Sequence, residues 1–481
     1  MSRAVRLGPV AAVVGFLAFV EFTSGIIQGY YTPLLTDIAR HLGVHDADVN
    51  WLEGSQLMLS ALVVPVFAKL GDMVGHKRML VWSTAITAAA STALAFTDVF
   101  WVFLVAWALQ GFYVVWLPLE IALVWSRSRS ADRPAAMTRK AAGLLVAALE
   151  IGAIVGALSA GALAEVLPIQ VLLLVPAVAV TACFFVILFG VDESPELAGG
   201  SLDTTGIVLI SLALLALTGG LSFLRLNGVA DVLPWALVAL GLLLLVPFVR
   251  HELRHPDPLI DVRMFRSPAL WPVFLTAGLF GVSVLGAQAP LSTFARTDAA
   301  AVGYGLGATS FQTSLLIGAY VLSLVVGAML FPLATRWVTP RVALIGASSM
   351  VAIGYFLFLP FHDAYPQVLA NMVIAGIGSG ALVAALPAAA AAAAPPQQTG
   401  VATGLTNSVK TVGGAIASCV FGIALLGAAG EAATGTAGTF AGYVTVWVVC
   451  GATAAVAAVL LAFVPRLAFS DAPEAEAAAV R

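Results

Sequence analysis

The feature that most constrains this chain is a series of fourteen long, nearly uncharged apolar runs. A helix needs about 20 apolar residues to cross a hydrocarbon core about 30 Å thick, and the runs are close to that length. They lie near residues 9–30, 51–68, 80–97, 100–125, 141–164, 167–190, 205–224, 233–249, 269–291, 311–334, 342–361, 366–392, 401–428 and 440–464. Strands of a membrane barrel would show short stretches of alternating polarity instead. The sequence therefore predicts an all-α polytopic membrane protein with 14 transmembrane helices.

Composition excludes a water-soluble fold for this chain. Of its 481 residues, 61% are hydrophobic and only 10% are charged, whereas about 25% of the residues in an ordinary soluble domain are charged. Arg3 and Arg6 precede the first apolar run, as they would in a secretory signal peptide. The run is too long for one and lacks a clear cleavage site of small residues. We expect it to be the first transmembrane helix.

The distribution of lysine and arginine predicts the orientation in the membrane. If the N-terminus is cytoplasmic and the helices alternate, 18 basic residues fall on the cytoplasmic side and 3 outside, as the positive-inside rule requires. The outer residues are Arg40, Arg225 and Arg296, and Lys410 lies within a run. The cytoplasmic residues are Arg3, Arg6, Lys69, Lys77, Arg78, Arg127, Arg129, Arg133, Arg139, Lys140, Arg250, Arg254, Arg263, Arg266, Arg336, Arg341, Arg466 and Arg481. We expect a protein of the bacterial cytoplasmic (inner) membrane with both termini in the cytoplasm.

The predicted helices fall into groups of six, two and six. Two similar bundles around a site near the bilayer midplane are a common plan of secondary transporters. The expected units are an N-terminal six-helix bundle at 8–190, two inserted helices at 203–252, a cytoplasmic linker at 253–267, a C-terminal six-helix bundle at 268–466 and a disordered cytoplasmic tail at 467–481. The tail is rich in Ala and Glu and has little apolar surface to bury. No soluble domain is expected.

A charged loop between the second and third predicted helices carries the first recognisable motif. The stretch 68–78 resembles the signature cytoplasmic loop of the major facilitator superfamily, with Asp72, Gly75 and Lys77 matching. Three positions depart from the family's pattern: Ala68, Met73 and His76. Gly75 permits a tight turn, and the charges of Asp72, Lys77 and Arg78 are expected to latch the two bundles on the cytoplasmic side. The alternative is that the loop only anchors the topology.

Two inserted central helices make the chain similar to the fourteen-helix drug:proton antiporters of that superfamily. The segments 108–111 and 407–414 resemble local patterns of these antiporters, and Gly152, Gly156 and Gly161 match their helix-5 glycine motif. The residues that depart from the patterns are Trp107, Ala157 and Ala160. The resemblance implies a major facilitator fold of two six-helix bundles plus two inserted helices, and proton-coupled drug efflux.

Glu21 is the first candidate for proton coupling. A charged side chain near the bilayer centre costs several kcal/mol on insertion scales, so it normally faces a cavity or a partner. Glu21 lies midway along the first helix, and Ser24, Gly25 and Gln28 share its face at helical spacing. The antiporters often carry an acidic residue here, which implies proton exchange. The alternative is a structural carboxylate bonded across the bundle.

Three further ionisable residues lie within predicted helices, each with two interpretations. Glu150 precedes the glycine motif and either couples protons or pairs with a neighbouring helix. Glu120 either forms the acidic inner end of a substrate cavity or reaches the headgroups. Lys410 either extends to the cytoplasm or pairs with a carboxylate across the interface between the bundles. We keep Glu21, Glu150 and Glu120 as the proton-coupling set.

Polar and aromatic residues on the first, second and fourth helices predict the wall of a substrate cavity. Gln28, Glu53 and Gln56 are its candidates on the first two helices. Gln110 and Tyr113 are those on the fourth, and Lys410 completes the set. The ring of Tyr113 could stack on an aromatic or cationic substrate.

These observations predict a secondary active transporter that exports lipophilic or cationic drug-like compounds in exchange for protons. The expected partners are a small lipophilic substrate, protons and the lipid bilayer, with no nucleic acid, and the chain is expected to be a monomer. No cofactor is expected, because the proton gradient supplies the energy, and no catalytic nucleophile and base stand at useful spacing. The alternatives are a dedicated carrier for one endogenous metabolite, lipid or antibiotic, and a membrane receptor or scaffold that does not transport.

The cysteines predict no disulfide framework and no metal site. Cys183, Cys419 and Cys450 all lie in apolar runs, without the spacing of metal ligands. We expect them to act as packing residues.

Overall fold

The protein is described by a computed structural model over residues 8–128, 134–193, 202–228, 230–256, 258–394, 399–427 and 437–463. The predicted tail at 467–481 lies outside these residues. The α-helices are α1 (Gly8–Tyr30), α2 (Leu35–Leu42), α3 (Val49–Val74), α4 (His76–Ala95), α5 (Phe100–Gln110), α6 (Trp116–Ser128), α7 (Pro134–Ala164), α8 (Ile169–Gly190), α9 (Thr204–Asn227), α10 (Val232–Glu252), α11 (Trp271–Gly281), α12 (Gln288–Arg296), α13 (Ala299–Val302), α14 (Ser310–Ala334), α15 (Pro340–Leu357), α16 (Tyr365–Ala393), α17 (Thr399–Leu426) and α18 (Phe440–Phe463). The short helical turns are η1 (Thr32–Leu34), η2 (Asp46–Asp48), η3 (Gly111–Val115), η4 (Val262–Arg266) and η5 (Val282–Gly286).

The all-helical membrane fold predicted from the apolar runs is confirmed, and the described part of the chain contains no strand. Among the described residues, 12 helical stretches are long and apolar enough to cross a membrane. The two remaining predicted crossings correspond to α1 and α4, helices of 23 and 20 residues that are outside this set. The α4 sequence contains several Ser and Thr residues, which lowers its hydropathy.

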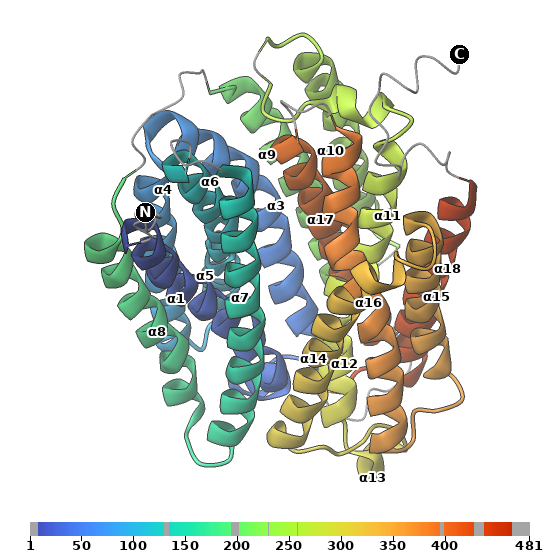
Figure 1. The fold of residues 1–481 in the computed structure, drawn as a ribbon. Helices are drawn as coiled ribbons and strands as arrows, with labels where there is room; N and C mark the ends of the chain where they lie inside the picture. The colour runs from blue at the N-terminus through green and yellow to red at the C-terminus, as the bar shows by residue number, and fades with distance from the viewer. Residues whose placement is uncertain are drawn as a thin grey trace.

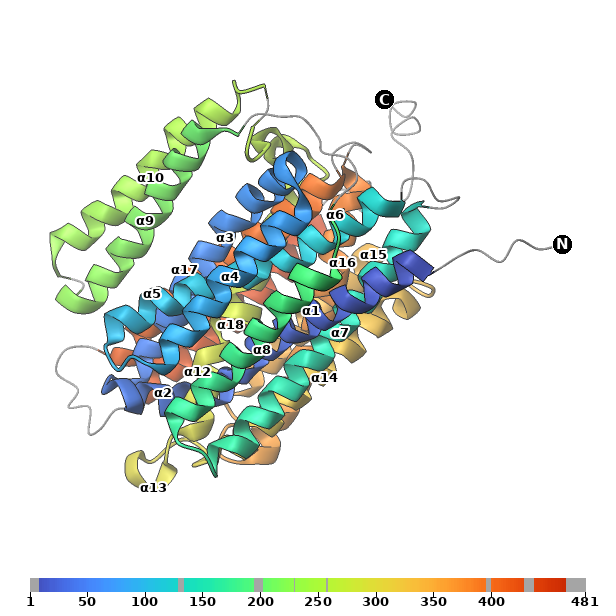
Figure 2. The same cartoon turned by 90° about the vertical axis from the view of Figure 1, so that its left-hand side faces the viewer.

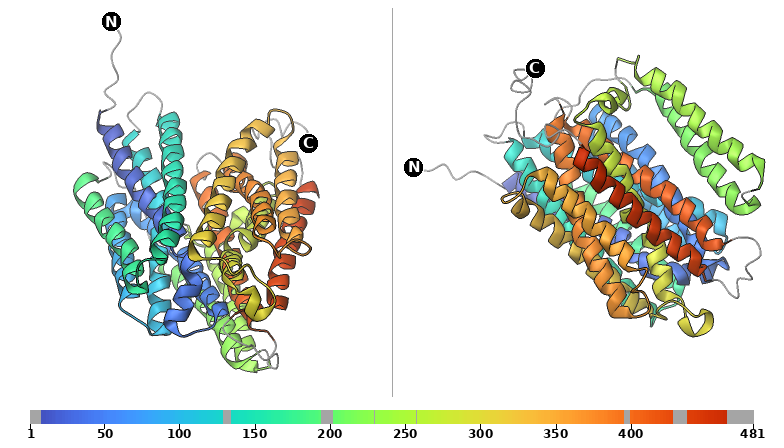
Figure 3. Two further views of the ribbon diagram at one scale, coloured as in Figure 1. Left: turned by 90° about the horizontal axis from the view of Figure 1, so that it is seen from below. Right: turned by 90° about the vertical axis from the view of Figure 1, so that its right-hand side faces the viewer.

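The helices form two bundles with a separate hairpin beside them (Figure 1). The first bundle comprises α1 to α8, in which α1 packs on α7 and α4 on α8. The second bundle comprises α11, α12 and α14 to α18, in which α14 and α15 both pack on α16. Helices α9 and α10 pair with each other and lie to one side (Figures 2 and 3). This hairpin touches the bundles through α9, which packs against α3 and α17, so it contacts one helix of each bundle.

The two ends of the molecule differ in their contacts, and we name them after the ends of α1. The Gly8 face is the end where α1 begins, and the Tyr30 face is the end where α1 stops. The helix α3 ends at the Gly8 face, and α9 begins and α10 ends there (Figure 2). At the Tyr30 face lie α2, the end of α12 and the start of α14 (Figure 2).

A seam of glycines holds α1 against α7. A Cβ atom at Gly152 or Gly156 would collide with the backbone oxygen of Phe22 or Ile26 of α1. On the other side of the seam, Gly25 is packed in the same way against the backbone of α7. Without a hydrophobic force between helices in lipid, such small residues allow the close backbone packing that drives association. Two glycines of the predicted helix-5 motif therefore hold the first bundle together.

Replacing Gly152 with alanine is expected to destabilise the protein by about 1–3 kcal/mol, because the added methyl group forces two backbones apart. Gly143 of the same helix is the matched control, since nothing lies within 4 Å of a Cβ atom there. Alanine at position 143 should leave stability unchanged or raise it slightly, because alanine favours a helix more than glycine does. Thermal unfolding of the purified protein in detergent measures both. Equal unfolding temperatures for the two variants would contradict the seam.

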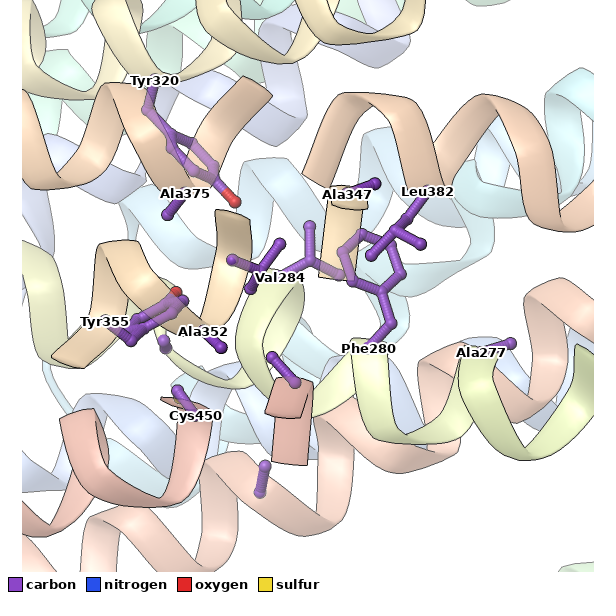
Figure 4. Close-up of a cluster of buried hydrophobic side chains, with 14 of the residues drawn as sticks. Ala277, Phe280, Val284, Tyr320, Ala347, Ala352, Tyr355, Ala375, Leu382 and Cys450 are labelled. Atoms are coloured by element: carbon purple, nitrogen blue, oxygen red, sulfur yellow. The ribbon is translucent and has the colours of Figure 1, made fainter. Parts of the chain in front are cut away.

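Two of the apolar runs that predict continuous helices are broken in the structure. The run 100–125 is divided by the 3-10 turn η3, where the carbonyl of Gly111 accepts a bond from the Ser60 hydroxyl. The run 269–291 is divided by the π turn η5, where the carbonyl of Ser283 accepts a bond from the Tyr355 hydroxyl at 2.7 Å. Figure 4 shows Tyr355 beside η5, within the buried cluster of the second bundle. A break in a membrane helix is tolerated where neighbouring side chains satisfy the freed backbone groups, and hydropathy alone does not reveal it.

Candidate functional site

A small cavity of about 40 Å³ lies between the two bundles, on the side toward the Tyr30 face. Its first-bundle lining consists of Ile27, Gln28, Tyr31, Thr32, Glu53, Gln56, Leu57, Trp107 and Tyr113, and its second-bundle lining of Leu285 and Gln288. A cavity of that volume holds no more than a few water molecules. The structure is therefore in a state in which this space is nearly closed.

Four of the six residues predicted for the cavity wall line this cavity: Gln28, Glu53, Gln56 and Tyr113. Gln110 does not, because its buried amide donates to the Tyr31 hydroxyl and the Ser91 hydroxyl, each at 2.8 Å. Gln110 thus supports the wall from behind. Lys410 also lies outside the lining.

Seven lining residues are absent from the predicted cavity wall: Ile27, Tyr31, Thr32, Leu57, Trp107, Leu285 and Gln288. Gln288 follows the π turn, and its amide donates to the carbonyl of Val284 at 3.0 Å. A glutamine within an apolar run is a signal in the sequence for a residue that avoids lipid. The π turn η5 before Gln288 is visible only in the structure.

Glu21 of α1 and Glu120 of α6 form a buried carboxyl pair. Both side chains are 0% exposed, and their carboxyl groups lie within hydrogen-bonding reach of each other. No N–H or O–H group of the described residues donates to any of the four oxygens. Ionising both carboxyl groups of one buried site is unfavourable, because two like charges would then lie close together in an apolar environment. Glu120 therefore does not reach the headgroups, which was one of its two interpretations.

Tyr113 connects this pair with the cavity. Its side chain lines the cavity together with Glu53, and its hydroxyl interacts electrostatically with both Glu53 and Glu21. Acidic side chains therefore extend from the cavity wall to the buried pair within the first bundle.

Glu150 and Lys410 lie in different bundles, close enough for the charge of each to act on the other. Glu150 lies on α7 of the first bundle and Lys410 on α17 of the second, and each interacts electrostatically with the other. No direct ion pair within 4 Å joins these two described residues. The pairing of Glu150 and Lys410 across the interface therefore stays a prediction.

A polar cluster joins the two bundles at the Tyr30 face. Arg296, at the end of α12, donates to the carboxylate of Asp37 on α2 at 2.8 Å. The same carboxylate accepts a bond from the hydroxyl of Ser310 on α14 at 3.0 Å. The side chains of Asp37 and Arg296 are 24% and 11% exposed, so water screens this ion pair only partly. The sequence contained one signal for this contact, because Arg296 is one of only three basic residues that the topology puts on the outer side of the membrane.

Apolar and backbone contacts close the same face around this cluster. Ala47 of η2 belongs to the buried core of the second bundle, and its carbonyl lies beside Gly422 of α17. A Cβ atom at Gly161 would collide with the Ser314 side chain of α14. The third glycine of the predicted helix-5 motif thus allows contact between the bundles rather than within one.

The signature loop has several contacts within the first bundle among the described residues. Gly75 has a φ of 116°, as the predicted tight turn requires, and Asp72 pairs with His76 at 3.1 Å. The backbone N–H groups of Lys77 and Arg78 donate to the carboxylate of Glu193 at 2.9 and 3.0 Å.

The latch between the bundles stays a prediction. The partner described for the loop is Glu193, which directly follows α8 of the first bundle. Its carboxylate satisfies the free N–H groups at the start of α4. Sequence reasoning missed Glu193 because nothing local links it to the loop.

The chain belongs to the Major Facilitator Superfamily, whose family profile matches residues 17–418. The members are membrane transporters and not enzymes, in agreement with the two bundles and the cavity between them. This confirms the family indicated by the signature loop.

Similar proteins include several exporters. The chain is 28% identical to the cephamycin export protein CmcT of Amycolatopsis lactamdurans, over 85% of this chain and 81% of that protein. It is 25% identical to the drug efflux pump JefA of Mycobacterium tuberculosis, over 89% of this chain and 80% of that one. A probable actinorhodin transporter of Streptomyces coelicolor is 25% identical, over 86% and 72% of the two chains.

Solved structures share the fold at low sequence identity. A POT peptide transporter in complex with sulfate matches with a TM-score of 0.68 and 16% identity, over 95% of each chain. The nucleoside transporter NupG matches with a TM-score of 0.66 and 13% identity, over 95% of this chain and 100% of the other.

Proposed function

We propose that this protein exports lipophilic, cationic small molecules across the bacterial inner membrane in exchange for protons, by alternating access. The observation that carries the proposal is the buried Glu21–Glu120 carboxyl pair beside a cavity between the two bundles. The names of the similar exporters support the direction of transport and the drug-like class of substrate.

The carboxyl pair is the proposed site of proton exchange. With both carboxyl groups protonated the pair is neutral. When one of the two protons leaves, one negative charge remains in an apolar bundle, where a substrate cation or a new proton must compensate it. Competition between proton and cation for that charge couples the two fluxes without a covalent step. Tyr113 and Glu53 give the cation a polar route along the cavity wall. Glu150 is assigned an assisting role, since the charge of Lys410 already offsets its own.

The proposed orientation puts the Gly8 face in the cytoplasm. The Lys/Arg asymmetry supports it, because the basic residues of the loops gather at that end of the helices. The Tyr30 face would then be external, and the Asp37–Arg296 contact would close the outer side of the cavity. In this state the substrate would enter from the cytoplasm.

The test is transport by the purified protein in liposomes with an acidic interior and a clamped membrane potential. A permanently charged lipophilic cation such as ethidium is the probe, because weak bases accumulate in acidic liposomes without a carrier. We expect the cation to enter while the internal pH rises. Empty liposomes and liposomes treated with a protonophore are the controls. Ethidium uptake that is indifferent to the pH gradient would exclude proton coupling.

A narrower function is the second candidate, in which the protein exports one natural product. It is favoured because similar proteins are named for single compounds, cephamycin and actinorhodin. A panel of cationic and neutral compounds in the same liposomes separates the two. A broad exporter moves several unrelated cations, whereas a dedicated one moves a single chemical type.

A further inference from the structure

The ends of α9 and α10 at the Gly8 face bring together a cluster of possible metal ligands. Asp203, the N-cap of α9, lies 2.8 Å from the Nε2 atom of His251 near the end of α10. His255 follows one helical turn later, with its ring centroid 5.3 Å from that of His251. One ligand atom from each of the three residues lies within 4.8 Å of the others.

Two buried carboxylate oxygens in this cluster have no hydrogen-bond donor. They are Oδ2 of Asp203 and Oε1 of Glu252, and the two residues are 2% and 1% exposed. Both oxygens point at the same spot, because a Cβ atom at Gly206 would collide with each of them. Buried anionic oxygens are normally paired or bound to a metal ion. Among the described residues, these two oxygens have no hydrogen-bond partner.

We propose that Asp203, His251 and His255, with Glu252 beside them, bind one divalent transition-metal ion of the zinc type. Imidazole nitrogen and carboxylate oxygen are the ligands that Zn²⁺ takes in proteins. Two charges on the ion would balance the two carboxylates while the imidazoles remain neutral. A zinc tetrahedron brings its ligand atoms to about 3.3 Å from one another, given bonds of about 2.0–2.1 Å, so the histidine side chains must close slightly.

The contacts and exposure of the ligands suit such a site. The Oδ1 atom of Asp203 accepts a bond from the N–H of Gly206 at 2.8 Å and lies 2.8 Å from Nε2 of His251, which fixes the orientation of the carboxylate. His251 is 28% exposed, which leaves the ion a route from solvent.

The bound ion would connect three segments that only the fold brings together. Asp203 begins α9, His251 lies 48 residues later on α10, and Glu252 accepts a bond from the N–H of Ile260 in the linker at 3.1 Å. The ion would hold the start of α9, the end of α10 and the linker together. Because α9 contacts α3 of the first bundle and α17 of the second, it would also stabilise the position of the hairpin against the bundles. The histidine spacing of four residues was a local signal for this site. The expectation of no metal site rested on the cysteines alone.

The test is metal binding by the full-length protein in detergent, stripped of metal and free of any histidine tag. Calorimetric titration should give about one Zn²⁺ per chain and no binding of Mg²⁺. Co²⁺ should give the visible absorption of a tetrahedral complex. We expect the separate variants His251→Ala and His255→Ala to weaken Zn²⁺ binding at least about a hundredfold, since even outer partners of metal ligands change affinity by about 10–100-fold.

His41→Ala is the matched control, because it removes a half-buried histidine of α2 outside the cluster, and its Zn²⁺ affinity should equal that of the wild type. Glu252→Gln keeps the shape of the cluster if a histidine variant fails to fold, and it should also weaken binding. Absence of Zn²⁺ binding, or binding that survives all three cluster substitutions, would overturn the proposal. The cluster would then hold a proton between Asp203 and Glu252. Neither result depends on transport, so this test and the test of the proposed function are independent of each other.

Discussion

Glu21→Gln is expected to abolish exchange of protons for substrate while the protein remains folded. Glutamine has the shape of glutamate, and its amide can donate to the Glu120 carboxylate that faces position 21. The glutamine side chain, however, has no acidic proton to release. Cation binding should weaken at least about tenfold, because each 1.4 kcal/mol of lost attraction is a tenfold loss of affinity. The measurements are internal pH and ethidium uptake in liposomes, and ethidium binding in detergent.

The partner substitution sharpens this expectation. Because Glu21 and Glu120 act as one buried pair in this proposal, Glu120→Gln should cause a loss of similar size, and the double variant should be no worse than either single one. Residues that act as a unit are strongly non-additive in this way. Asp98→Asn is the matched control, since Asp98 is an exposed acid at the Tyr30 face, and it should transport normally. Full proton-coupled transport by folded Glu21→Gln would exclude the pair as the proton site.

Arg296→Ala is expected to open the Tyr30 face. The substitution removes the guanidinium that donates to Asp37 and to the carbonyl of Ala308. Hydrogen bonds to charged groups contribute about 1.5–3 kcal/mol each, so losing the contact should shift the equilibrium toward the state open at this face by at least about tenfold. Spin labels at Asp98→Cys and Ala300→Cys, in a background without native cysteines, measure the separation of the bundles. The variant should populate longer distances.

Two further variants test whether the effect belongs to the ion pair. Arg40→Ala is the control, because Arg40 also approaches Asp37, at 3.5 Å, but is 60% exposed and lies in the same bundle. It should leave the distances unchanged, since exposed ion pairs contribute little. The exchanged pair Asp37→Arg with Arg296→Asp should recover part of the closed population. If Arg296→Ala and Arg40→Ala gave the same distances, the pair would not be the closing contact.

The glycines and the acidic residues differ in how far sequence predicts them. Gly152 and Gly156 are recognisable as packing residues from their spacing alone, and the structure puts both against α1. The depth of Glu21 follows in the same way from its position in an apolar run. The sequence does not predict that Glu120 is the partner of Glu21, because Glu120 lies in a different apolar run and could contact other groups there.

The sequence by itself determined the helical membrane fold, the positions of the spans and the family. These follow from local properties: the length of an apolar run, the periodicity of a helix and the charge of the short loops. The tertiary structure alone decided that Glu21 meets Glu120, that Asp37 meets Arg296 and that Asp203 meets His251. Lipid is as apolar as leucine, so an apolar helix surface does not tell which side faces a neighbour. Those pairings depend on how each helix is rotated and broken, and the turns η3 and η5 are held by side chains from distant helices.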